Sequence, residues 1–259
     1  MFSVLDCCHL CFIALDSDNT SQVCYHSSKY IWGNALQYKD KLKYDKSSAD
    51  FEREYTPECI SKMMQIGRDS GFFVTYNHPS WSEEEKEQYC NYHGMHAMEI
   101  YNHSSFVLGY PEYNEKEYDQ MLKNGEKIFC IATDDNHNHT PLDSRLCDSF
   151  GGFTMIKAEK LDYKEITNAL LSGHFYCSQG PEIKELWIED NEIHIKCSPA
   201  DKIVMNTGIR EAHVRYSEDA PLTEASFKIN PLLRYVRITV TDKNGLHANT
   251  NAYFMQDYL

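Results

Sequence analysis

Short apolar segments alternate with amphipathic segments through the first two thirds of the chain. The apolar segments have the continuous pattern of strands that are covered on both faces, and they lie at 72–76, 95–102, 127–133 and 151–157. The amphipathic segments carry helix-capping residues and lie at 57–68, 82–92, 113–124 and 162–171. Strands that alternate with helices indicate parallel β-α-β units, so the pattern predicts an α/β fold.

The pattern changes near Gly180-Pro181. Beyond this point the apolar residues alternate with polar ones at period two, and turn pairs such as Asp190-Asn191 and Asn244-Gly245 separate the segments. The predicted strands lie at 183–188, 192–197, 202–205, 212–216, 227–229 and 235–241. Strands without intervening helices indicate a separate antiparallel unit. We therefore divide the chain into an α/β part, residues 1–180, and an antiparallel β domain, residues 181–259.

The chain opens on an apolar segment, residues 1–15, which we interpret as a strand. Residues 16–50 are polar, rich in aromatic residues and irregular, so we expect a loop with little regular structure.

Residues that can bind a metal follow the predicted strand at 127–133. The sequence continues with Asp134, Asp135 and His137, and a carboxylate presented beside an imidazole suits Zn, Mn or Fe. A surface turn that is polar by chance is the alternative interpretation. The carboxyl ends of parallel strands face a common crevice, however, which favours a functional site.

Two further strands end in comparable residues. His78 and Pro79 follow the strand at 72–76, and Glu99 lies in the strand at 95–102. Pro79 biases His78 toward an extended backbone, which would hold the imidazole at the strand end. A lone histidine here would be expected to bond a loop carbonyl. Because several strands end in this way, we expect His78 to approach Asp135 and His137 closely enough to share one ion.

Composition narrows the class of protein. The formal net charge of -14 and the scattered Lys and Arg residues argue against general nucleic-acid binding. A bound metal would reverse the local charge, so acidity does not exclude a phosphorylated substrate. The chain has neither an apolar run of membrane-spanning length nor the basic region of a signal peptide, and we expect a cytoplasmic protein with no membrane partner.

Ten cysteines are scattered through the chain, several of them in predicted strands, where a free thiol behaves as a small hydrophobic group. The one tight cluster is Cys7-Cys8-His9-Leu10-Cys11. A structural zinc site needs a second pair at matching spacing. We therefore interpret this cluster as part of a core strand.

Four motifs, in this order and spacing, resemble the PHP family of phosphoesterases, named for polymerase and histidinol phosphatase domains. They are Asn77-His78-Pro79, Met98-Glu99-Ile100-Tyr101-Asn102, Ala132-Thr133-Asp134-Asp135-Asn136-His137, and the stretch from Gly173-His174 to Glu182-Ile183. The resemblance implies a distorted (β/α)₇ barrel with a metal cluster at the carboxyl ends of its strands, followed in some bacterial members by a small β domain.

The resemblance also implies site residues. His78 matches the family's His-Pro metal ligand, and Asp135 and His137 match its late Asp-x-His pair. Asp134 is then a supporting partner or an alternative ligand, and Glu99 matches an acidic position of supporting role. The implied cofactor is a divalent metal (Zn, Mn or Fe), and the implied substrate is a small phosphorylated molecule.

The chain also departs from the family pattern. Family members begin with a strand carrying His-x-His and continue to a Thr-Asp-His and a Glu, and residues 1–50 contain none of these motifs. The chain therefore resembles an incomplete, N-terminally truncated barrel with fewer ions, and we assign neither His9 nor His26 as a ligand. The leading expectation is an impaired metal-dependent phosphoesterase. The alternatives are a non-catalytic metal-binding or structural remnant and an amidohydrolase-type metal hydrolase.

Overall fold

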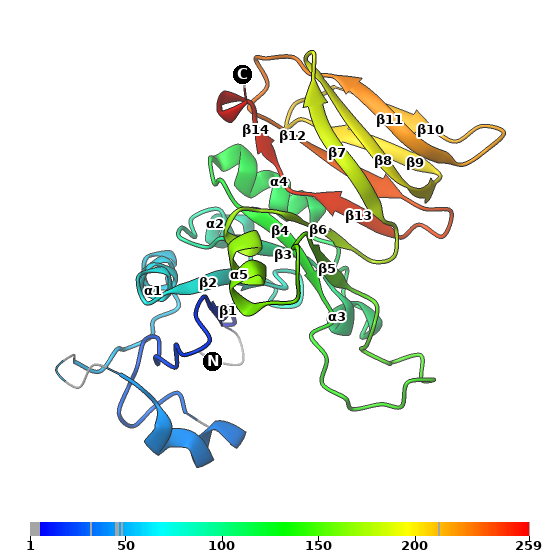
Figure 1. The fold of residues 1–259 in the computed structure, drawn as a ribbon. Helices are drawn as coiled ribbons and strands as arrows, with labels where there is room; N and C mark the ends of the chain where they lie inside the picture. Colours follow the sequence, from blue (N-terminus) through cyan, green and yellow to red (C-terminus); the bar gives the residue numbers. More distant parts are fainter. Residues whose placement is uncertain (1–5, 32, 45–46, 48, 212, 259) are drawn as a thin grey trace.

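The computed structural model describes residues 6–31, 33–44, 47, 49–211 and 213–258. Its first sheet has the order β1-β2-β3-β4 and lies at the centre of the molecule in Figure 1. These strands are β1 (His9–Ala14), β2 (Phe72–Asn77), β3 (Ala97–Asn102) and β4 (Phe129–Thr133). Strands β2, β3 and β4 are parallel, as expected, whereas β1 is antiparallel to β2.

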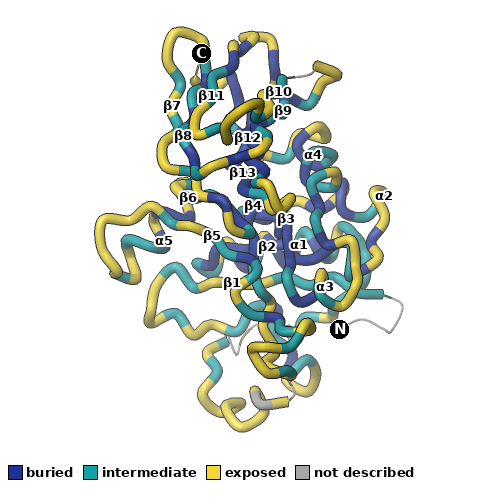
Figure 2. Tube along the Cα trace, turned by 90° about the vertical axis from the view of Figure 1, so that its right-hand side faces the viewer, coloured by how far each residue is buried: buried dark blue, intermediate teal, exposed yellow. Residues whose placement is uncertain are grey.

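The strands β2 and β3 are buried along their whole length, as their continuous apolar sequences predict. Figure 2 shows that buried segments follow these strands and continue into β12 and β13, while exposed segments form the periphery. The described residues between 16 and 50 hold one 3₁₀ helix, Gly33–Lys41, and little other regular structure, which agrees with the expected loop.

Helix ends agree with the capping residues in three cases. Helix α1 (Pro57–Asp69) begins after Thr56, whose side chain accepts a hydrogen bond from the N–H of Cys59. Helix α4 (Glu115–Asn124) ends at Gly125, which has a left-handed φ of 112°. The N-cap of α5 (Tyr163–Leu171) is Asp162. Helix α3 (His103–Val107) was not expected from the sequence.

The predicted helix at 82–92 is mostly wrong, because α2 comprises only Lys86–Tyr89. Two residues of the expected first turn have tertiary partners instead. The Oγ atom of Ser82 lies 3.2 Å from the Nδ1 atom of His78. The buried carboxylate of Glu84 accepts hydrogen bonds from three tyrosine hydroxyl groups, those of Tyr55, Tyr76 and Tyr92. These partners hold the segment in an irregular turn.

The strands after Pro181 are all antiparallel, and the helical structure described there is one 3₁₀ turn, Met255–Asp257, as the period-two pattern predicts. The strands are β7 (Ile183–Glu189), β8 (Glu192–Ala200), β9 (Lys202–Asn206), β10 (Val214–Tyr216), β11 (Leu222–Lys228), β12 (Tyr235–Thr241), β13 (His247–Thr250) and β14 (Tyr253–Phe254). The sequence predicted only the end of β11 and missed β13 and β14. Residues 1–5 and 212, which it placed in strands, lie outside the described residues.

Strands from both sides of residue 180 share a sheet. The second sheet has the order β10-β9-β12-β13-β6-β5, with β14 paired to β12, and it includes β5 (Phe153–Ile156) and β6 (Phe175–Ser178). The third sheet has the order β11-β8-β7. The pairing of Ala248 with Ser178 joins β13 to β6 across the expected boundary, and the division into two domains stays a prediction.

The α/β class is as expected, but the described residues form mixed sheets and no closed barrel. Strands β4 and β5 belong to different sheets. The Thr154 hydroxyl lies between them, where it accepts a hydrogen bond from the N–H of Ala132 and donates one to its carbonyl. A side chain thus provides the polar contact that a continuous backbone ladder would make in a barrel.

A buried arginine connects β12 to α4. The guanidinium of Arg237, which is fully buried, donates two hydrogen bonds of 2.9 Å to the Asp119 carboxylate and one of 2.9 Å to Glu115. Planar two-point pairing of this kind compensates the cost of burying a charge. This contact fixes the second sheet against the α/β part.

Candidate functional site

Two histidines that are distant in the sequence meet at one edge of the first sheet. Because β1 runs antiparallel to β2 and His9 is paired with Asn77, His9 lies beside His78, the residue that follows β2. The Nδ1 atom of His9 is 3.0 Å from the Nε2 atom of His78, and the ring centroids are 4.7 Å apart. His9 was not expected as a ligand, because it lies outside the family pattern and nothing in its local sequence indicates this contact.

The His78 backbone is held in a left-handed conformation with a φ of 32°, so the expected extended backbone was wrong. The reason is a buried acceptor beneath it, since the His78 N–H donates a 2.8 Å hydrogen bond to the Glu99 carboxylate. Burial, and then the neighbouring His9, lower the pKa of His78 to about 4. Burial also lowers the pKa of His9. Both rings are therefore neutral near pH 7, the state that binds metals.

Glu99 supports the candidate site through hydrogen bonds to its buried carboxylate. Its side chain is fully buried, and besides the His78 N–H it accepts hydrogen bonds from Asn77, Asn102 and Thr133. Burial raises its pKa to about 7. The amide of Asn102 donates to Glu99 at 3.0 Å and to Asp135 at 3.2 Å, so it connects the buried carboxylate to a site residue.

Asp135 and His137 lie in the loop that follows β4, and both residues are exposed. Asp135 has a φ of 49°, and its carboxylate accepts the hydrogen bond from Asn102. The N–H of His137 donates a 2.7 Å hydrogen bond to Asp148, and this bond is the main cause of a lowered pKa for that carboxyl. The His137 ring stacks on His139 at a centroid distance of 5.7 Å.

Asp134 anchors the loop. Its carboxylate accepts hydrogen bonds from the N–H groups of Phe150, Gly151 and Gly152. Gly151 is required there, because a Cβ atom would lie 2.1 Å from the ring of His103. Among the described residues, Asp134 therefore holds the two ends of the 135–149 loop together.

A cavity of about 480 Å³ lies beside the His9–His78 pair and the loop that follows β4. His78, Asp135 and His137 line it, and His9 and Trp81 line it as well. Glu99 and Asp134 do not line it. The structure thus brings three of the five predicted site residues to one cavity and places the other two in its supporting framework.

The cavity brings together residue types that can bind a metal. Two nitrogen ligands of a tetrahedral zinc ion lie about 3.3 Å apart, close to the 3.0 Å between His9 and His78. Among the residues that the structure describes, however, no three His, Cys, Asp or Glu side chains are grouped closely enough to hold an ion. The two histidines form one side of a possible site, and Asp135 and His137 lie in the loop across the cavity.

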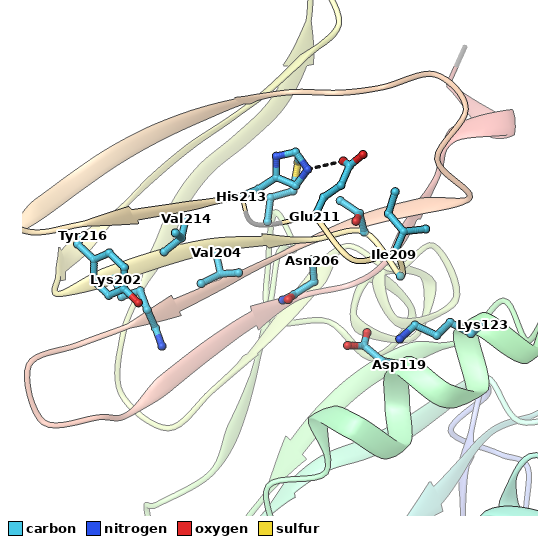
Figure 3. Close-up of a pocket in the computed structure, with 13 residues that line it drawn as sticks. Asp119, Lys123, Lys202, Val204, Asn206, Ile209, Glu211, His213, Val214 and Tyr216 are labelled. Carbon is cyan, nitrogen blue, oxygen red and sulfur yellow. Dashed lines mark hydrogen bonds and ion pairs between the residues drawn. The ribbon is translucent and has the colours of Figure 1, made fainter.

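A second cavity, of about 280 Å³, lies between α4 and the β9–β10 hairpin and contains none of the predicted site residues (Figure 3). Its acidic groups already have partners: Glu211 lies 2.7 Å from the Nε2 atom of His213, and Asp119 binds Arg237. Its geometry therefore offers no comparable set of ligands.

Comparison of this chain with protein-family models, with curated proteins and with solved structures finds no match. No helix in the described part of the chain is long and apolar enough to cross a membrane.

Proposed function

We propose that the cavity between His9, His78 and the 135–137 loop is the divalent-metal site of a PHP-type phosphoesterase that acts on a small phosphorylated substrate. The observation that carries the proposal is the approach of His9 to His78 within a cavity that Asp135 and His137 also line. The lowered pKa values of the buried His78 ring and the partly buried His9 ring support it, because neutral imidazoles bind metals.

His78, Asp135 and His137 would hold the ion, and His9 joins them in this proposal. Nitrogen and carboxylate donors suit Zn, Mn or Fe. A bound ion supplies a Lewis acid for the phosphoryl oxygen and lowers the pKa of a water molecule. Glu99 would act as a positioning residue, since it fixes the His78 backbone directly and Asp135 through Asn102.

We further propose that the α/β part is a segment of a PHP-type (β/α)₇ barrel. Three parallel strands, β2, β3 and β4, with polar groups at their carboxyl ends, match a segment of a (β/α)₇ barrel. We also propose that the protein is cytoplasmic. Its ten cysteines are free thiols, which are typical of a reducing compartment.

The second candidate is a non-catalytic metal-binding or structural module. The observation that favours it is the lack of a preformed group of three ligands among the described residues. Such a module would bind an ion weakly and leave phosphate esters intact. An amidohydrolase-type site would bind the same ions and cleave amides in preference to phosphate esters.

Metal titration by calorimetry, followed by an assay of aryl phosphate hydrolysis, tests the proposal. We expect Mn or Zn to bind with one ion per chain, and His78→Ala to weaken binding at least about tenfold. His174→Ala is the matched control, because His174 is exposed and does not line the cavity. Equal affinity in the wild type and in His78→Ala would overturn the site assignment. Metal binding without any hydrolysis would favour the non-catalytic module.

A further inference from the structure

The cavity has two chemically different walls. His9, His78, Asp135 and His137 provide nitrogen and oxygen donors, while Trp81, Val107, Leu108 and Leu146 provide apolar surface. We propose that the site binds a phosphate monoester whose alcohol is aromatic or apolar and carries no second anionic group. This inference rests on the proposed function and specifies its substrate.

Trp81 provides an aromatic surface beside the imidazole pair. Its ring centroid lies 4.9 Å from that of His78 and 5.4 Å from that of His9. Its backbone is fixed, because the Trp81 N–H donates a 2.7 Å hydrogen bond to the buried carboxylate of Glu112. The ring centroid of Tyr110 lies 6.5 Å from that of Trp81. An aromatic group attached to a phosphate at the imidazoles would therefore meet a ring held in place.

Two leucines leave apolar surface exposed at the cavity. Leu108 follows α3 and Leu146 lies in the loop after β4, and their exposed fractions are 60% and 51%. Binding is favoured when a ligand covers apolar surface of this kind and removes it from water. The two side chains come from different segments and line the same cavity, so one apolar ligand group can cover both.

The charges of the cavity limit the ligand to one phosphate. Of the described residues that line the cavity, none is Lys or Arg, while Asp135 and Asp148 contribute carboxylates. One divalent ion would balance the two carboxylates, and a second phosphate would find no cation to bind. The site therefore favours monoesters over nucleoside diphosphates and bisphosphates.

Calorimetry with non-hydrolysable phosphonates tests the inference without relying on turnover. The probes are phenylphosphonate, methylphosphonate and benzene-1,4-diphosphonate, each titrated into the Mn-loaded chain. We expect phenylphosphonate to bind about tenfold more tightly than methylphosphonate, from the buried ring area. We also expect the diphosphonate to bind more weakly than phenylphosphonate. Equal affinities for the phenyl and methyl compounds, or tighter binding of the diphosphonate, would overturn the inference.

Variants locate the apolar wall. Trp81→Ala and Leu146→Ala should reduce the preference for the phenyl compound over the methyl compound to about twofold or less. Leu142→Ala is the matched control, because Leu142 lies in the same loop, is 73% exposed and does not line the cavity. A preference that survives both cavity variants, or that falls equally in the control, would contradict the assignment of the wall.

Methyl-group NMR separates this inference from the proposed function. If the chain binds no metal, the proposed function fails, and phenol added to the metal-free chain still tests the wall. Shifts at the methyl groups of Val107, Leu108 and Leu146, with none at Leu142, support an aromatic-binding wall. The absence of such shifts overturns it.

Discussion

His9 and His78 are 69 residues apart in the sequence, and yet their Nδ1 and Nε2 atoms lie 3.0 Å apart. The antiparallel pairing of β1 with β2 produces this contact, since it returns the start of β1 to the end of β2. A parallel β1 would place His9 at the opposite edge of the sheet. The direction of one strand thus decides whether the cavity has one imidazole of this pair or two.

The first prediction concerns the coupling between these histidines. If both bind the same ion, their contributions to metal affinity are not additive, because removal of either ring spoils the same site. We expect His9→Ala to weaken Mn or Zn binding at least about tenfold. The double variant with His78→Ala should bind no more weakly than His78→Ala alone. Calorimetric titration of the four proteins measures this cycle, and independent additive losses would contradict a shared ion.

The second prediction concerns activity. A phosphoesterase with several ions uses one to prepare the nucleophile and another to stabilise the leaving oxygen, so a site with an incomplete ligand set should be slow. We expect only feeble hydrolysis of 4-nitrophenyl phosphate with Mn or Zn, and none in His78→Ala. Robust turnover by the wild type, lost in that variant, would show that other residues complete the ligand set.

The third prediction concerns the pH dependence of stability. Burial raises the pKa of Glu112 from its usual value of 4.5 to about 7. Between these values the folded chain binds more protons than the unfolded chain, so this contribution to stability is fully present below pH 4.5. It is lost as the pH rises through 7, and the 2.5 pH units correspond to about 3 kcal/mol.

Glu112→Gln should remove this contribution, so that its free energy of unfolding falls less between pH 4.5 and 7 than that of the wild type. Urea denaturation at several pH values measures the difference. Glu126→Gln serves as a control on a carboxylate that is not fully buried. Parallel pH profiles for the wild type and Glu112→Gln would show that the folded chain does not raise this pKa.

The fourth prediction concerns the contact between α4 and β12. Arg237→Ala leaves the carboxylates of Asp119 and Glu115 without their shared partner in a partly buried position. Removal of one member of a buried ion pair costs about 3–5 kcal/mol, whereas an exposed pair contributes less than about 1 kcal/mol. Lys127→Ala, which breaks the exposed pair with Asp257, is therefore the comparison. Similar losses in both variants, measured by denaturation, would contradict a stabilising role for the buried arginine.

Local chemistry predicted the parts of the fold that depend on neighbouring residues. Thr56 and Gly125 mark helix ends because a cap satisfies backbone groups within a few positions of itself. The strands β2, β3 and β4 follow from short apolar segments, and the antiparallel strands after Pro181 follow from alternation at period two. The polar ends of the parallel strands also predicted that His78, Asp135 and His137 would come close enough to share one ion. All three line one cavity, but among the described residues no three ligands are grouped closely enough to hold an ion, so the shared ion stays a prediction.

Tertiary structure decided the features that depend on distant partners. The segment that begins at Ser82 has the composition of a helix start, but the Glu84 carboxylate is buried and accepts a hydrogen bond from Tyr55, which lies 29 residues away in the sequence. Glu99 and Asp134 resemble ligands in the sequence, and yet backbone N–H groups, side-chain amides and a hydroxyl occupy their carboxylates. His9 joins the cavity only through strand pairing. In each case the tertiary fold determines which residues become partners, and the local sequence pattern does not contain this information.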